Sequence, residues 1–146
     1  MTLDPLGNIV LDSQGDDELI IISNPQTSDQ RVLHLPLTYR TGAGVAPVEV
    51  DDTAFTTSTE GVILFADKGS NKVYQLKKKA FAPGTAYTAA DGGPFVGIID
   101  LTTGIITPIV TGLGNPGGMV FVDTSKQDND DDSREANGRD SCREDN

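Results

Sequence analysis

Apolar residues along this chain come in short runs separated by turns rich in Gly, Asn, Asp, Ser and Pro. The runs favour Ile, Val, Thr, Phe and Tyr, which suit a pleated and half-buried surface. No window keeps a 3.6-residue apolar period over a helical length, so the pattern predicts an all-β chain. The expected strands lie in residues 7–13, 18–24, 31–37, 53–58, 61–67, 72–78, 95–100, 105–111 and 118–122.

Two stretches, ELIIISNPQTSDQRVLHL (18–35) and GVILFADKGSNKVYQL (61–76), repeat one design of apolar strand, polar turn and alternating strand. Ile20 and Ile63 occupy matching positions 43 residues apart. A repeat of about 40–50 residues with short strands is the period of a propeller blade. The continuous apolar run at 19–22 fits a middle strand that neighbouring blades cover on both faces.

The sequence ILFADKGSNKVYQL (63–76) resembles the blade centre of NHL-type and gluconolactonase-like β-propellers. An Asp after the second strand, a Gly/Asn turn and a Val-aromatic pair recur there. The segment DLTTGIITPIVTGLGNPGGMVFV (100–122) is similar to the junction between two blades of the same class. The resemblance spans roughly residues 7–122. It implies an architecture and no function, because enzymes, scaffolds and sensors share this fold.

We therefore expect an all-β fold, a partial β-propeller-like arc of four-stranded antiparallel blades followed by a disordered acidic C-terminal tail. The repeat region is residues 1–122, with blade 1 at about 4–50, blade 2 at about 51–112 with an insertion at 80–94, the first strand of a further blade at 113–122, and the tail at 123–146.

Closed propellers have about four to eight blades, so a chain with two blades leaves three explanations open. It is a piece of a longer propeller, one part of a ring of several chains, or a small β-sandwich with blade-like spacing. The strand at 118–122 favours the first, because its partners are expected outside the chain. An open arc exposes apolar faces at both ends, which predicts self-association through the open blade faces.

The insertion AFAPGTAYTAADGGP (80–94) is expected to be a long surface loop, too rich in Ala, Gly and Pro for a core strand. Long loops on rigid scaffolds often carry binding residues. Tyr87 and Asp91 are the expected contacts with an unknown ligand or protein, and an inert insertion is the alternative.

The composition of the chain excludes some classes of binding partner. The formal net charge is −11, and the only basic cluster is the short run Lys77–Lys79. Because phosphate groups repel such an acidic surface, we expect no binding to nucleic acid or to an anionic membrane. No signal peptide and no run near the ~18 apolar residues of a membrane span is found, so we expect a soluble chain of undetermined compartment. The single cysteine, Cys142, predicts no internal disulfide.

The catalytic inventory is small. His34 is the only histidine, expected on an exposed edge strand, and no nucleophile motif accompanies it. The resemblance implies a divalent cation in the central channel, held by Glu, Asn and Asp from different blades, that polarises a lactone carbonyl and activates water. The oxygen ligands available at the starts of inner strands are Asp4, Asp51, Asp52 and Asn115.

Hard oxygen ligands suit Ca²⁺ or Mg²⁺. Asp51, Asp52 and Asn115 fit turn residues better, so no cofactor is expected and Ca²⁺ is the alternative. The ligand motifs of the family do not match residue by residue, so no catalytic residue is assigned. The acidic segment 128–139 lacks the Gly and Glu of an EF-hand loop and predicts no calcium loop.

These observations lean against an enzyme. The leading hypothesis is a non-catalytic binding or scaffold module, or a fragment of a longer propeller protein. A sensor propeller with an unknown ligand has the same signature. The alternative is a metal-dependent gluconolactonase-like hydrolase whose remaining blades lie outside this chain.

Overall fold

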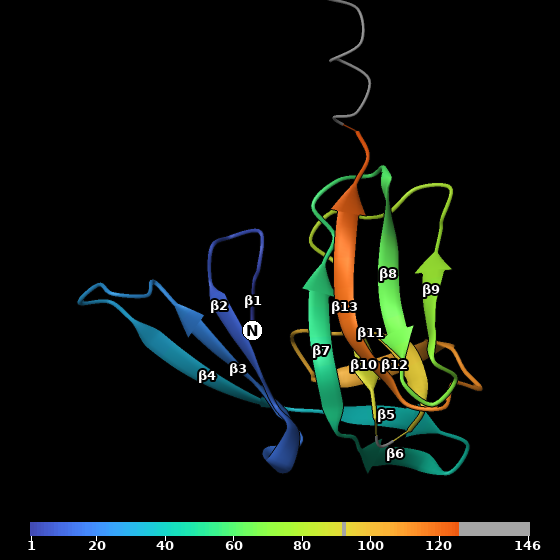
Figure 1. Cartoon of the computed structure of the whole chain (residues 1–146). Coiled ribbons are helices and arrows are strands. Elements are labelled where there is room, and N and C mark those ends of the chain that lie inside the picture. Colours follow the sequence, from blue (N-terminus) through green and yellow to red (C-terminus); the bar gives the residue numbers. More distant parts are fainter. Residues whose placement is uncertain (92, 126–146) are drawn as a thin grey trace, which may run out of the picture.

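The computed structural model describes residues 1–91 and 93–125 and confirms the all-β prediction. Within this part of the chain the strands form three sheets, which we call A, B and C, and the one helical segment is a single 3-10 turn at Gln14–Asp16 (Figure 1). No helix in the described residues is long and apolar enough to cross a membrane. The predicted acidic tail, with Cys142 and segment 128–139, lies outside the described residues from position 126 onward.

Sheet A is an antiparallel meander in the order β1-β2-β3-β4. Its turns carry the polar residues that separate the apolar runs. The strands are β1 (Thr2–Leu3), β2 (Ile9–Ser13), β3 (Glu18–Ser23) and β4 (Arg31–Pro36).

Sheet B has six strands in the order β6-β5-β12-β11-β10-β7, all antiparallel to their neighbours except the parallel pair β5 and β12. Its β5–β6 hairpin was not predicted from the sequence. The strands are β5 (Thr38–Thr41), β6 (Gly44–Pro47), β7 (Val50–Phe55), β10 (Ala86–Ala90), β11 (Phe95–Ile99) and β12 (Ile105–Val110).

Sheet C has three antiparallel strands in the order β13-β8-β9, namely β8 (Gly61–Asp67), β9 (Lys72–Leu76) and β13 (Pro116–Asp123). Two expectations are corrected here. The segment 51–112 is not one blade, because β7 pairs with β10 in sheet B while β8 and β9 belong to sheet C. The strand at 118–122 has its partner inside the chain, since β13 pairs with β8 along its length.

Strand β10 overturns the prediction that 80–94 is a surface loop. All five of its residues are buried, and it lies between β7 and β11 inside sheet B. Ala86 and Ala90 face the core shared with sheet A, whereas Tyr87 and Ala89 face the core shared with sheet C. The three Ala side chains of β10 fit where two layers close on the same strand from opposite faces, while Tyr87 fills the core on the side of sheet C.

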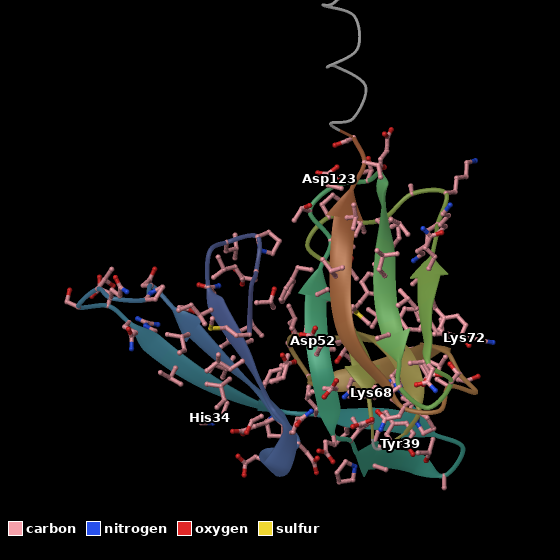
Figure 2. The ribbon with its side chains drawn as sticks, viewed as in Figure 1. His34, Tyr39, Asp52, Lys68, Lys72 and Asp123 are labelled. Atoms are coloured by element: carbon pink, nitrogen blue, oxygen red, sulfur yellow. The ribbon has the colours of Figure 1, made fainter. Side chains whose placement is uncertain are left out.

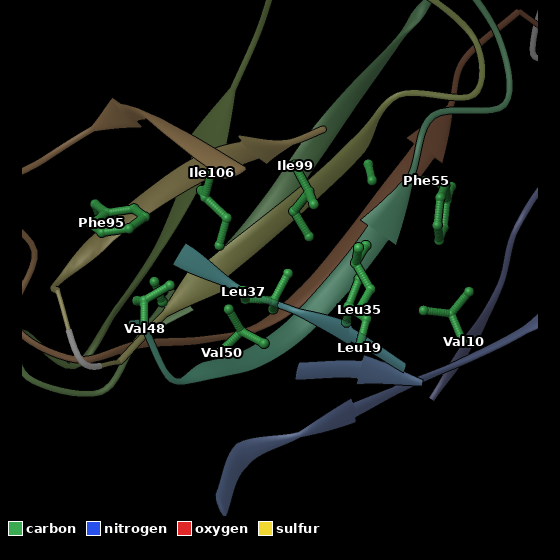
Figure 3. Close-up of a cluster of buried hydrophobic side chains, with 12 residues drawn as sticks. Val10, Leu19, Leu35, Leu37, Val48, Val50, Phe55, Phe95, Ile99 and Ile106 are labelled. Carbon is green, nitrogen blue, oxygen red and sulfur yellow. The ribbon is translucent and has the colours of Figure 1, made fainter. Parts of the chain in front are cut away.

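The two cores join the three sheets into a stack with sheet B in the middle. The first core packs Val10, Leu19 and Leu35 of sheet A onto sheet B (Figure 3). The second packs Ile63 and Phe65 of sheet C onto the opposite face of sheet B. Sheet B is therefore covered on both sides, and sheets A and C form the two ends of the stack.

Candidate functional site

Sheet A is apolar on both faces, and residues 1–91 and 93–125 cover only one of them. Leu19 and Val10 point into the core and are fully buried. Ile22 and its cross-strand neighbour Val32 alternate with them and point away from it. We call this second surface the outer face of sheet A; it consists of Leu3, Ile9, Leu11, Ile20, Ile22 and Val32, none of which belongs to either core.

Sheet C has the same two-sided character. Ile63 and Phe65 are buried against sheet B, and the residues between them on β8 point outward. Val73 on β9 is 72% exposed and Val120 on β13 is 51% exposed. The apolar residues of the outer face of sheet C are Val62, Leu64, Ala66, Val73, Val120 and Val122, and the exposed Gln75 lies among them, opposite Leu64.

The two ends of the stack carry opposite charge. Residues 1–36, which form sheet A and its turns, contain six Asp or Glu and one Arg, a net charge of −5. Residues 61–79, which form β8, β9 and the loop after them, contain five Lys and one Asp, a net charge of +4. The third strand of sheet C, β13, adds Asp123 and leaves this end at +3. His34 of sheet A and Lys72 of sheet C lie on opposite sides of the molecule (Figure 2).

His34 belongs to the same side of β4 as Val32, as the alternation predicted. Its Nδ1 lies 2.8 Å from Oε1 of Glu18 at the margin of the outer face of sheet A, and its side chain is 60% exposed. The pair places a carboxylate at the edge of this apolar surface.

Two of the predicted metal ligands, Asp4 and Asp51, serve local structure. Asp4 accepts hydrogen bonds from the backbone N–H of Leu6 at 2.9 Å and from that of Asn8 at 2.8 Å, closing the turn between β1 and β2. Asp51 accepts hydrogen bonds from the side chains of Gln14 and Lys68. These contacts hold sheet A and the β8–β9 turn against β7.

Of the other two candidates, Asp52 joins two strands that share no ladder, whereas Asn115 immediately precedes β13 and lies beside Asp67 of β8, the ladder partner of β13. Asp52 Oδ2 accepts a 2.7 Å hydrogen bond from the backbone N–H of Met119, which ties β7 to β13 across the boundary between sheets B and C. The backbone N–H of Asn115 donates to Asp67 Oδ1 at 2.6 Å. No group of three or more His, Cys, Asp or Glu that could hold a metal ion is found in residues 1–91 and 93–125, and the Ca²⁺ site stays a prediction.

The two predicted contact residues, Tyr87 and Asp91, do not lie together on a surface loop. Tyr87 lies within β10, and Asp91 follows the last residue of that strand. Tyr87 is 1% exposed, and its hydroxyl accepts a 3.2 Å hydrogen bond from Lys78 Nζ. It lies in the core between sheets B and C, not on the surface loop that was expected. Asp91 follows β10, is half-buried, and donates its backbone N–H to Glu49 O at 3.0 Å.

A buried polar pair that no sequence pattern predicted joins sheet A to β7. Thr53 Oγ1 donates a 2.5 Å hydrogen bond to Asp12 Oδ1, although 41 residues separate the two. Asp12 Oδ2 has no hydrogen-bond partner and lies 3.9 Å from the Met1 ammonium nitrogen. Burial raises the pKa of the Asp12 carboxyl, against the opposing effect of the Thr53 hydrogen bond.

A cleft of about 390 Å³ opens beside this pair, between β1, β7 and β13. Its walls are mostly apolar, and Asp52 is the one carboxylate among the residues that line it. Both oxygens of Asp52 accept backbone hydrogen bonds, from Thr53 and Met119. The lining residues are Met1, Thr2, Leu3, Asp52, Thr53, Ala54, Phe55, Thr57, Met119, Val120 and Phe121.

Comparison of this chain with protein-family models, with curated proteins and with solved structures gives no match. The NHL-type and gluconolactonase-like resemblance therefore stays a prediction. The feature that stands out in the geometry is the pair of apolar outer faces at the two ends of the stack.

Proposed function

We propose that this chain is a non-catalytic scaffold module that binds protein through the outer faces of sheets A and C. The observation that carries the proposal is the contrast between the layers. Sheet B is covered on both faces, whereas the end sheets each turn one apolar face to solvent. Extended exposed apolar surfaces of this kind mark sites of protein interaction.

The internal contacts indicate how a partner would bind. Sheet C packs on sheet B through Ile63 and Phe65. Sheet A contacts the other face of sheet B through Val10, Leu19 and Leu35, while the rest of sheet A projects away (Figure 1). The outer faces present the same residue types on the same pleated geometry. A further β-sheet laid on either end would extend the stack, with apolar burial worth about 25 cal/mol per Å². This is also the packing that a propeller-like arc implies, and we retain that architecture as part of the proposal.

The experiment that tests the proposal measures δ-gluconolactone hydrolysis and thermal unfolding of the purified chain, with and without millimolar Ca²⁺. A scaffold leaves the hydrolysis rate at the uncatalysed value and the Tm unchanged by Ca²⁺. Hydrolysis that is lost in Asp51→Asn, or a Tm that rises with Ca²⁺ in the parent and not in that variant, would overturn it in favour of the hydrolase. Thr102→Ala, an exposed change away from the predicted ligands, is the control variant.

A further inference from the structure

We propose that the partner is a second copy of this chain, bound head to tail, with the outer face of sheet A of one copy packed on the outer face of sheet C of the next. This inference rests on the proposed scaffold function and names its partner. The contact is heterologous, since each copy uses two different surfaces.

The two surfaces match in chemistry and form. Each is one face of a regular sheet whose apolar residues are Val, Ile, Leu or Ala. The same registers place the Glu18–His34 pair on the face of sheet A and Gln75 on the face of sheet C. Each carries a side chain more than half exposed away from the cleft between β1, β7 and β13, namely Val32 on sheet A and Val73 on sheet C. Covering these side chains removes apolar surface from water on both copies, which is the main favourable term in association.

Charge decides which faces meet. Two copies that joined through sheet A would bring segments of net charge −5 together, and two that joined through sheet C would bring segments of net charge +3 together. Head-to-tail packing instead sets the acidic end against the basic end. Like charges across an interface cost several kcal/mol, whereas opposite charges steer association and fix the orientation.

The charged groups lie at the margins of the apolar surfaces, where they can pair without being buried. Glu18 borders the outer face of sheet A beside His34. Lys72 and Lys77 flank the two ends of β9, and both are exposed. A polar rim around an apolar centre is the usual anatomy of a protein interface.

The experiment is analytical ultracentrifugation of the full chain over a range of concentrations, for the parent and for two variants that each block one face. Val32→Lys places a cation in the acidic end, and Val73→Glu places an anion in the basic end. Both positions are more than half exposed, so circular dichroism and Tm should match the parent. Val45→Lys is the control, because Val45 is 58% exposed on β6 and belongs to neither face.

We expect the parent and Val45→Lys to associate. The association constant of each blocked variant alone should fall about a hundredfold or more, because its contact would bury an unpaired charge. An equal mixture of Val32→Lys and Val73→Glu should associate again, since each supplies the intact face that the other lacks. Raising the salt concentration should weaken association of the parent.

Two results would overturn the inference. If one blocked variant still dimerises alone, the contact joins identical faces. If the parent stays monomeric at high concentration, the chain is not its own partner. Neither result affects the scaffold proposal, whose failure shows separately as lactone hydrolysis or Ca²⁺ binding.

Discussion

At the residue scale, three aspartates with the same ordinary pKa behave differently because of their surroundings. Burial raises the pKa of Asp12. Asp67 has a lowered pKa because the backbone N–H of Asn115 donates to it, with further hydrogen bonds from Ser70 and Gly114. Asp100 also has a lowered pKa, chiefly because it accepts the backbone N–H of Thr102. Asp12 is thus the carboxylate whose charge the fold disfavours.

Asp12→Asn should raise the stability of the chain at neutral pH. The folded-state pKa of Asp12 lies above the unfolded value of 3.8, so the folded state binds the proton more tightly. The free energy of unfolding therefore falls as pH rises from about that unfolded value through the folded pKa. The uncharged amide lacks this dependence and keeps an oxygen for the Thr53 hydroxyl.

Urea unfolding across acidic to neutral pH provides the measurement. The stability difference between variant and parent should be smallest at low pH and grow toward neutral pH. A difference that does not vary with pH would show that burial does not disfavour the Asp12 charge. Asp29→Asn, in the exposed turn between β3 and β4, is the control.

Val10 and Val32 form a matched pair for testing which face of sheet A is covered. Val10 is 0% exposed in the first core, and Val32 is 52% exposed on the outer face. Val10→Thr puts a hydroxyl into the core and should cost about 1–3 kcal/mol. Val32→Thr should change stability by no more than about 0.5 kcal/mol.

Urea unfolding at chain concentrations low enough to keep the protein monomeric gives both values. Equal losses for the two variants would mean that the outer face is part of the chain's own core. That result would remove the basis of the interaction proposal.

At the scale of elements, sequence reasoning located strands better than their partners. Runs such as Gly61–Asp67 were recognisable because β-branched and aromatic residues cluster between turns. The pairing of β7 with β10 instead of β8 depends on side chains far apart in sequence, which no local pattern encodes. Strand β10 was missed because its Ala residues carry no β signal and are selected by close packing on two sides.

The candidate site was predictable only in the part that local sequence patterns encode. The apolar run at 19–22 indicated a strand with two apolar faces, both expected to be covered by neighbouring blades. The expectation of open faces at the ends of an arc came from the small number of blades. The separation of acidic residues before position 37 from lysines after position 67 was also readable in the sequence. What could not be read was that these segments form opposite ends of one stack, because that depends on sheet B lying between them.

Ala89 tests the packing of β10. It is 0% exposed and faces the core between sheets B and C. Ala89→Leu inserts extra carbon atoms where the layers already touch and should cost about 1–3 kcal/mol. Ala80→Leu, at an exposed position before β10, is the matched control and should be nearly neutral. Chemical denaturation measures both, and a neutral Ala89→Leu would contradict the close approach of the sheets.

At the scale of the whole molecule, the three sheets are not held equally. Sheet B contributes to both cores, whereas sheet A is anchored through one core and projects away from the rest of the stack (Figure 1). Parts of a fold with fewer buried contacts open at lower free energy than the centre. Sheet A is therefore the layer expected to open first, and it is also the layer that carries the acidic interaction face.

Hydrogen exchange should reveal this order and connect it to association. At low chain concentration, amides of β3 and β4 should exchange faster than those of β10 and β11, because opening sheet A leaves the second core intact. As the concentration rises, a copy bound on the outer face of sheet A should slow exchange in β3 while β10 changes little. Val32→Lys should abolish that concentration dependence, because it blocks the contact without unfolding the sheet.

Equal protection of all the strands at low concentration would contradict the order of opening. Slower exchange in β3 at high concentration that persists in Val32→Lys would place the contact elsewhere on the chain.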